Sequence, residues 1–220
     1  ARVAFARVAA EAADEKVREA GHFDLVLTLN RLRRFQDLIA EADRYLTRYG
    51  ENAALVANGR VPSVAFMRAE AFVNQEFFEE ALPAMRALLQ AYPEHPLRTR
   101  IEFYEALSLA MLEQFDESIA KLKAWLQKHP DDPARPEVEY WLPVAEFYAG
   151  QYREAMPLFE RYAAANPMSV YAPEAEYRAA LCRYALEEFG AAATQLAAWI
   201  EKYPAHTFHG EALVTAGDAF

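Results

Sequence analysis

The sequence predicts an all-α protein, a right-handed superhelix (solenoid) built from antiparallel helix pairs. The first observation is a repeated helix ending. Residues 86–93, 123–130, 160–167 and 197–204 read RALLQAYP, KAWLQKHP, ERYAAANP and AAWIEKYP. Because proline cannot donate a backbone hydrogen bond and clashes with the preceding turn, each stretch predicts where a helix stops. Identical endings indicate similar units stacked side by side.

The second observation is a fixed period. The residue directly before each closing proline lies 14 positions after an aromatic residue, here called the anchor. The anchors recur every 37 residues. The anchors are Phe78, Phe115, Tyr152 and Phe189. Phe35 opens an earlier copy, which closes at Gly50 and is followed by an insertion before the next unit.

Two further columns repeat with the anchors. Three positions after them the residues are mostly small, namely Leu38, Ala81, Ser118, Ala155 and Ala192. Ten positions after them the residues are large and apolar, namely Tyr45, Leu88, Trp125, Tyr162 and Trp199. A small residue facing a large one at helical spacing lets two helices approach closely and interlock. Another helical stretch precedes each anchor, so each unit is expected to be a helix, a tight turn and a second helix.

The repeat array is expected to cover residues 22–220, in units at about 22–56, 62–98, 99–135, 136–172 and 173–209 and a half unit at 210–220. Residues 1–21 are expected to be an N-terminal helix ended by Gly21, either a cap or the remnant of an earlier unit. The half unit begins a first helix without its partner. We therefore expect Leu213, Val214 and Phe220 to be left half covered, and the natural protein to continue beyond Phe220.

Composition narrows the partner classes. Hydrophobic residues make up 54% of the chain and charged residues 25%, which predicts an ordered protein. The formal net charge of −10 disfavours duplex nucleic acid and anionic membranes as partners. No apolar run approaches the roughly 20 residues that span a bilayer, so direct membrane insertion is not expected.

These columns resemble tetratricopeptide repeats, which share the small residue three positions after an aromatic, the helix-closing proline 15 positions after it, and paired antiparallel helices. The common period of that family is 34 residues. Here it is 37, with the extra residues in the connection before each first helix. This variant is similar to repeats of bacterial cell-envelope proteins, such as outer-membrane assembly lipoproteins and the periplasmic coordinator of the Tol–Pal system. The resemblance alone favours a periplasmic or envelope location over a cytoplasmic one.

The sequence offers little chemistry for catalysis. It contains no Gly-rich phosphate loop, nucleophile elbow or HExxH motif, so we expect neither enzymatic activity nor a cofactor. His206 and His209 have a spacing that can share a metal, but only Glu211 stands nearby as a third ligand. A loop followed by a helix start is the favoured interpretation, without a metal. Cys182 lies in an apolar run and predicts a buried, unreactive thiol.

A column of aromatic residues is the better candidate for function. Twelve positions before each anchor stand Phe23, Phe66, Phe103, Tyr140 and Tyr177. The resemblance places this column on the first helix, facing the concave groove that binds partner peptides. A second column seven positions later ends in Phe147 and Tyr184, two turns away on the same helix face. The candidate partner-binding residues are Phe66, Phe103, Tyr140, Phe147, Tyr148, Tyr177 and Tyr184.

The alternative is that these rings are packing, because aromatic residues at helical spacing are more often core than binding surface. Composition favours the groove, since tyrosine couples an apolar ring to a polar tip and suits half-wet interfaces. Acidic residues flank the columns, which favours a basic or neutral partner segment. They are Glu70, Glu137, Glu146 and Glu174.

The sequence therefore predicts a non-catalytic scaffold or adaptor that binds a protein or peptide in its concave groove, in a bacterial envelope assembly if the finer resemblance holds. Two alternatives stay open. One is a repeat domain that self-associates through the ends of the array. The other is an accessory domain of a larger enzyme or secretion machine.

Overall fold

The computed structural model describes residues 1–219, and Phe220 lies outside the described residues. Every regular element in this part of the chain is an α-helix, which confirms the all-α prediction. The chain divides into two compact bodies, Ala1–Leu112 and Glu113–Phe220. We call them the N-terminal body and the C-terminal body, and each is described by itself.

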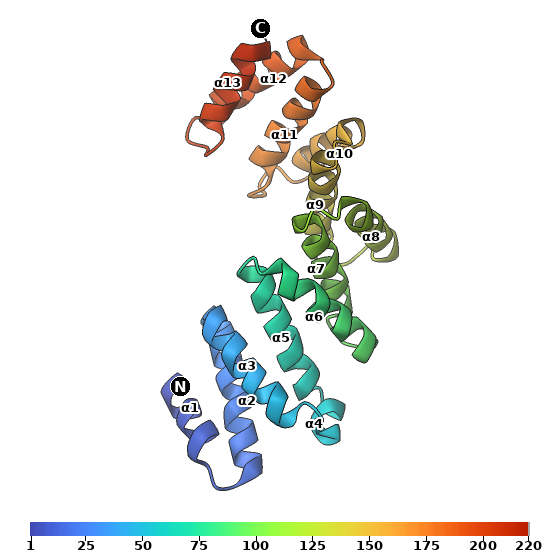
Figure 1. Ribbon diagram of the computed structural model, residues 1–220. Coiled ribbons are helices and arrows are strands. Elements are labelled where there is room, and N and C mark those ends of the chain that lie inside the picture. Colours follow the sequence, from blue (N-terminus) through green and yellow to red (C-terminus); the bar gives the residue numbers. More distant parts are fainter. Residues whose placement is uncertain (220) are drawn as a thin grey trace. The chain divides into compact units, whose positions relative to one another are not determined.

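Seven helices form the N-terminal body (Figure 1). They are α1 (Arg2–Glu11), α2 (Glu15–Arg31), α3 (Phe35–Tyr49), α4 (Ala53–Ala57), α5 (Arg60–Asn74), α6 (Phe78–Ala91) and α7 (Arg98–Met111). Consecutive long helices pack against each other, and α3 also packs against α5. Helix α4 is a single short helix and occupies the insertion that the sequence places after the first unit.

Six helices form the C-terminal body (Figure 1). They are α8 (Phe115–Lys128), α9 (Arg135–Tyr148), α10 (Tyr152–Ala165), α11 (Ala172–Ala185), α12 (Phe189–Lys202) and α13 (His209–Ala219). Each helix packs against the next, and α9 also touches α11. The helices before the anchors, such as α9 and α11, are called first helices below, and those after the turn second helices.

The repeat columns locate the helices. Every anchor is the first residue of a second helix, at α3, α6, α8, α10 and α12. The small column three positions later is completely buried in all five helices, and the large column ten positions later is also buried. These two columns are thus the packing seams that the spacing predicts.

The second helices that precede a proline all end in the same way. The capping residues that directly follow them are Tyr92, His129, Asn166 and Tyr203, with φ between −131° and −125°. Each donates its backbone N–H to the carbonyl of the large column residue four positions earlier, at 2.9 Å. The next residue is the proline, which has no N–H to continue the ladder. The predicted helix stops are confirmed.

The tight turns between first and second helices require a left-handed backbone residue. Gly150 fills this position in one unit, with φ 75°. The other turns use side-chain-bearing residues there, namely Arg33, Glu76, Glu113 and Glu187, with φ between 52° and 63°. Such residues carry a steric cost in this region because Cβ approaches the backbone. The turn geometry is therefore kept at the expense of local strain.

The expectation of one N-terminal helix ended by Gly21 is wrong. Helix α1 ends at Glu11, and α2 begins at Glu15 and continues through Gly21. The break follows from Asp14, whose carboxylate accepts hydrogen bonds from the backbone N–H groups of Lys16 and Val17 and so starts a new helix. Gly21 lies where α1 crosses α2, because a Cβ there would come within 2.5 Å of Cγ1 of Val8.

At the other end of the array, α13 packs against α12, and Ala212 and Ala216 are buried. Val214 lies 37 positions after Tyr177, at the next position of the first aromatic column, and is 66% exposed. Leu213 is exposed too. Phe220, which was expected to be half covered beside them, lies outside the described residues.

Replacing Glu187 with glycine should stabilise the protein by up to about 1 kcal/mol, because glycine adopts a positive φ without the Cβ clash. Chemical denaturation followed by circular dichroism measures this. Gly150→Ala is the matched control and should lose about 1 kcal/mol. A destabilising Glu187→Gly would show that the Glu187 turn is not strained.

Replacing Gly21 with alanine should loosen α1, because the added Cβ would collide with Val8. The gain of about 1 kcal/mol in helix propensity opposes this effect but leaves the collision in place. Hydrogen exchange should show faster exchange in residues 2–11 of the variant, with the exchange of α5 unchanged. Unchanged exchange in α1 would mean that the helix crossing adjusts without cost.

Candidate functional site

Four of the five rings in the first aromatic column lie inside the core, and Phe23 is half-buried. The side chains of Phe66, Phe103, Tyr140 and Tyr177 are all buried, and Tyr140 is only 2% exposed. Burial is also the main reason that the pKa values of the Tyr140 and Tyr177 hydroxyls are raised above their usual value. These four rings match the packing alternative, and they do not offer their faces to a partner in this structure.

Each buried ring in the C-terminal body is covered from two directions. The ring of Tyr140 lies 5.4 Å from that of Tyr162 on α10 and stacks on Tyr171, in the connection before α11, at 4.3 Å and 13°. Tyr177 repeats the arrangement with Trp199 on α12 and Phe208 in the connection before α13, both at 5.2 Å. The connection thus closes over the face that the resemblance assigns to a groove.

Aromatic side chains at the turn end of the first helices remain accessible. Tyr148, the last residue of α9, is 58% exposed, and Phe147 beside it is half-buried. The ring of Phe115 at the start of α8 lies nearly parallel to Tyr148, with ring centroids 6.4 Å apart. In the next unit Tyr184 is half-buried and packs edge-on against the exposed Phe189, at 5.3 Å.

Arg178 on α11 contacts two of these aromatic side chains, Phe147 and Tyr148. Its guanidinium carbon lies 5.3 Å from the centroid of Tyr148 and 5.9 Å from that of Phe147. It also donates a long hydrogen bond of 3.4 Å to the Tyr148 hydroxyl and pairs with Glu174 at 2.5 Å. A cation over an aromatic face is attractive and becomes more so as water is excluded. We call Phe115, Phe147, Tyr148 and Arg178 the Tyr148 cluster.

The sequence analysis named Phe147, Tyr148 and Tyr184 as candidates but did not name Arg178. Its position in the sequence could have indicated it, because Arg178 directly follows Tyr177 of the first aromatic column and so lies on a neighbouring face of the first helix. Its Nη1 atom is buried without a hydrogen-bond partner, and only 12% of the side chain is exposed. The arginine is held inside the cluster and is not a free surface charge.

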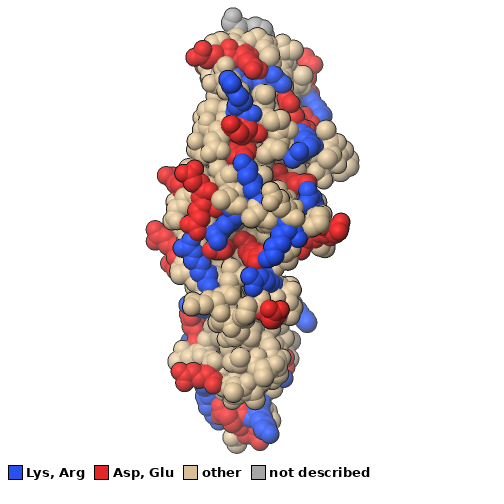
Figure 2. All heavy atoms as spheres, turned by 90° about the vertical axis from the view of Figure 1, so that its right-hand side faces the viewer, with Lys and Arg blue, Asp and Glu red and all other residues tan. Residues whose placement is uncertain are grey.

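The acidic residues beside the columns are largely neutralised by the protein itself. Glu70 pairs with Arg100 at 3.3 Å, Glu146 with Lys123 at 2.7 Å, and Glu174 with Arg178. Figure 2 shows acidic and basic side chains interspersed on the face that it presents, without a large field of one sign. Because these carboxylates are paired within the protein, they offer less attraction to a basic partner segment than the sequence alone suggests.

The remaining sequence candidates show no catalytic arrangement. Cys182 is completely buried, and burial raises the pKa of its thiol to about 12, which keeps it protonated and unreactive. Within residues 1–219 no three His, Cys, Asp or Glu side chains come together as a metal site. The helices of this same stretch are all too short or too polar to cross a bilayer.

Comparison with known families matches the repeat geometry. A family model described as tetratricopeptide repeat matches residues 66–133 and 144–207, more than half of the chain. The chain belongs to the tetratricopeptide repeat family. The search of curated proteins found no significant match to this tetratricopeptide repeat chain.

Solved tetratricopeptide repeat structures share the fold at low sequence identity. YrrB, a TPR protein with an unusual peptide-binding site, is 18% identical, with a TM-score of 0.67 over 96% of this chain and 98% of its own. A tetratricopeptide repeat protein from Parabacteroides merdae is 15% identical, with a TM-score of 0.66 over 99% of this chain and 77% of its own. MamA from Desulfovibrio magneticus is 14% identical, with a TM-score of 0.65 over 84% and 97%. These similarities support the fold.

Replacing Tyr140 with alanine should lower the free energy of unfolding by about 3–5 kcal/mol, because the change leaves a cavity between α9, α10 and the following connection. Replacing Tyr148, which is mostly exposed, should cost less than about 1 kcal/mol. Chemical denaturation of the two variants checks this difference. Equal losses would place Tyr148 in the core, and a small loss for Tyr140 would contradict its packing role.

Proposed function

We propose that this protein is a non-catalytic scaffold that binds a partner protein segment at the turn ends of its first helices, through the Tyr148 cluster and Tyr184. The observation that supports this most is the exposed but fixed ring of Tyr148. Its neighbours Phe147 and Arg178 hold it in one orientation. A large side chain that is ordered before binding loses little conformational freedom when a partner arrives.

The partner chemistry follows from the surroundings of the cluster. An aromatic ring with a hydroxyl at its edge suits a half-wet interface, in which a partner side chain covers the ring and the rim stays hydrated. The nearby carboxylates already have basic partners within the chain. We therefore propose a neutral segment with an aromatic, aliphatic or proline side chain as the anchor.

The length of the bound segment can be estimated. Neighbouring helices lie roughly 8–10 Å apart, and an extended peptide rises about 3.3 Å per residue. One unit would then contact about three peptide residues. Tyr148 and Tyr184 belong to adjacent units, so a segment of about six residues would contact both units.

The finer assignment to a bacterial envelope assembly rests on the 37-residue period and on the sequences of the connections. Self-association is the second candidate. It is favoured by the exposed Leu213 and Val214 on α13, which leave an apolar helix face uncovered. Molecular mass that increases with concentration in solution would support self-association, and loss of that increase in Val214→Glu would locate it. An accessory role in a larger enzyme or secretion machine is the third candidate.

We expect a random-peptide display library to yield binders whose affinity falls at least tenfold, about 1.4 kcal/mol, in Tyr148→Ala. Tyr148 is the most exposed residue of the cluster. Isothermal titration calorimetry with the selected peptides measures this, after circular dichroism has shown that each variant is folded.

Phe77→Ala is the matched control, because Phe77 is an exposed aromatic residue of the N-terminal body. Its binding should be unchanged. Peptides that bind the wild type and Tyr148→Ala equally would move the binding surface away from the cluster and overturn the proposal.

A further inference from the structure

A cleft of about 590 Å³ opens in the N-terminal body beside α4, the helix of the insertion. Side chains from α2, α3, α4 and α5 line it. Cavities of roughly 300–1,000 Å³ are typical of sites for small molecules. The cleft is far from the Tyr148 cluster in sequence and lies wholly within the other body, so it raises a separate question of function.

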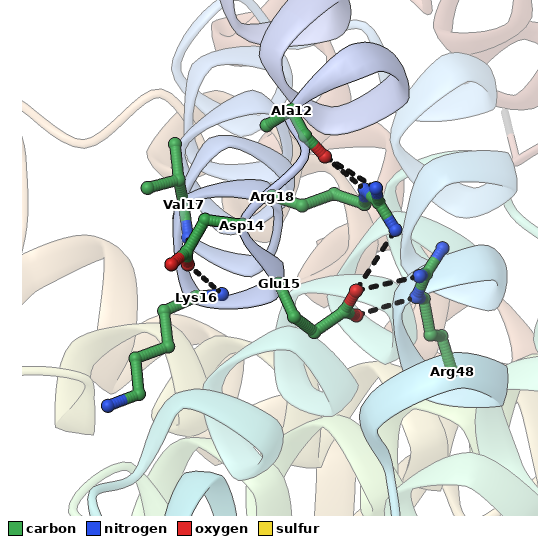
Figure 3. Close-up of polar contacts among 7 residues, drawn as sticks. All are labelled: Ala12, Asp14, Glu15, Lys16, Val17, Arg18 and Arg48. Atoms are coloured by element: carbon green, nitrogen blue, oxygen red, sulfur yellow. Dashed lines mark hydrogen bonds and ion pairs between the residues drawn. The ribbon is translucent and has the colours of Figure 1, made fainter.

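The acceptor groups of the cleft are already occupied. The buried carboxylate of Glu19 accepts hydrogen bonds from the Tyr45 hydroxyl and from Nη1 of Arg60. The carboxylate of Glu15 accepts from Nε and Nη2 of Arg48, both at 2.9 Å, and from Arg18 at 3.0 Å (Figure 3). Both carboxylates are therefore already paired with donors of the protein, which leaves only part of their acceptor capacity to a ligand.

The side-chain oxygens of the two asparagines in the cleft also accept hydrogen bonds from the protein. The side-chain oxygen of Asn52 accepts from the backbone N–H groups of Ala54 and Leu55 and so caps α4. The side-chain oxygen of Asn58 accepts from the backbone N–H of Arg60. Each side chain thus keeps its NH₂ group for another acceptor.

Several hydrogen-bond donors that line the cleft have no acceptor within the protein's described residues. Among the described residues, no acceptor pairs with the Lys16 ammonium or with the NH₂ groups of Asn52 and Asn58. Figure 3 shows the Lys16 side chain extending away from the Glu15–Arg48 pair, with its ammonium in none of the drawn contacts. A site with occupied acceptors and spare donors is matched by a ligand rich in acceptors.

Tyr49 supplies a second, independent observation. It lines the cleft, it is only 5% exposed, and its hydroxyl is buried without a hydrogen bond of standard geometry. Burial and, after it, the nearby carboxylate of Glu15 raise the pKa of this hydroxyl. A buried hydroxyl that has lost its water and gained no partner is unfavourable. In this site the unpaired hydroxyl is one more donor that a bound acceptor would satisfy.

The local charge also opposes that of the whole chain. The residues that line the cleft include three positive ones, Lys16, Arg48 and Arg60, and two negative ones, Glu15 and Glu19. The lining therefore has one excess positive charge, whereas the formal net charge of the protein is −10. Apolar side chains complete the cleft, namely Ala20, Ala54 and Leu55. The cleft thus combines a positive, donor-rich part with a short apolar wall.

We propose that this cleft binds a small organic anion. Its carboxylate or phosphate group accepts hydrogen bonds from Lys16, from the asparagine NH₂ groups and from Tyr49, and its short apolar part lies against Leu55. The insertion builds the site, because α4 and its flanking asparagines supply one wall. The proposal is independent of the function proposed for the Tyr148 cluster.

Isothermal titration calorimetry of the full chain with three probes tests this proposal. The probes are valerate, n-butyl phosphate and inorganic phosphate, each at low and at high sodium chloride. At least one of the two organic anions should bind, and more weakly at high salt. The stronger of the two identifies the head group as carboxylate or phosphate. Binding of inorganic phosphate alone, or of none of the three, would overturn the proposal.

Two variants localise the binding. Lys16→Gln removes an exposed charge that has no partner in the protein and should weaken affinity by about tenfold. Tyr49→Phe should weaken affinity by a similar factor while raising the melting temperature of the free protein, because it removes the unpaired hydroxyl. A role in structure alone would change the melting temperature and leave the affinity as it was.

Matched controls exclude general effects. Arg161→Gln removes one positive charge from the C-terminal body and should leave affinity unchanged. Tyr45→Phe removes a hydroxyl that does have a partner, Glu19, and should lower the melting temperature instead of raising it. Equal loss of binding in Arg161→Gln and Lys16→Gln would mean that net charge, and not the cleft, attracts the anion.

Discussion

The repeat depends on an aromatic ring held between two successive units. In the C-terminal body, Tyr140 and Tyr177 pack against the large residue near the end of their own second helix and stack on a ring from the following connection. A polar contact holds the start of α11, where the indole N–H of Trp199 donates to the carbonyl of Pro173 at 2.6 Å.

This packing explains what the sequence could and could not predict. The anchors and closing prolines act locally, through helix starts and stops, so their spacing was enough to locate the second helices. Whether a ring of the first aromatic column is buried depends on a residue 31 positions later. Tyr171 stacks on Tyr140, and Phe208 stacks on Tyr177. The longer connection of the 37-residue period carries those rings. A resemblance to shorter repeats therefore assigned to a groove a column that this chain buries.

Other differences have equally local causes. Asp14 starts α2 by accepting two backbone hydrogen bonds, and a pattern of alanines alone did not reveal that break. Arg178 was missed because its importance comes from two aromatic residues on another helix. The candidate surface that remains lies at the turn ends, where no connection covers it. The cleft beside α4, by contrast, depends on the insertion, which is a departure from the repeat.

The covering of each ring by the next connection has a consequence for how the C-terminal body comes apart. A unit whose neighbour unfolds loses the stacked ring over its own core and is weakened in turn, so stability passes between adjacent units as in a one-dimensional chain of coupled elements. Loss of Phe208 is expected to uncover Tyr177, and loss of Tyr171 to uncover Tyr140. The protein would fray in steps of one repeat.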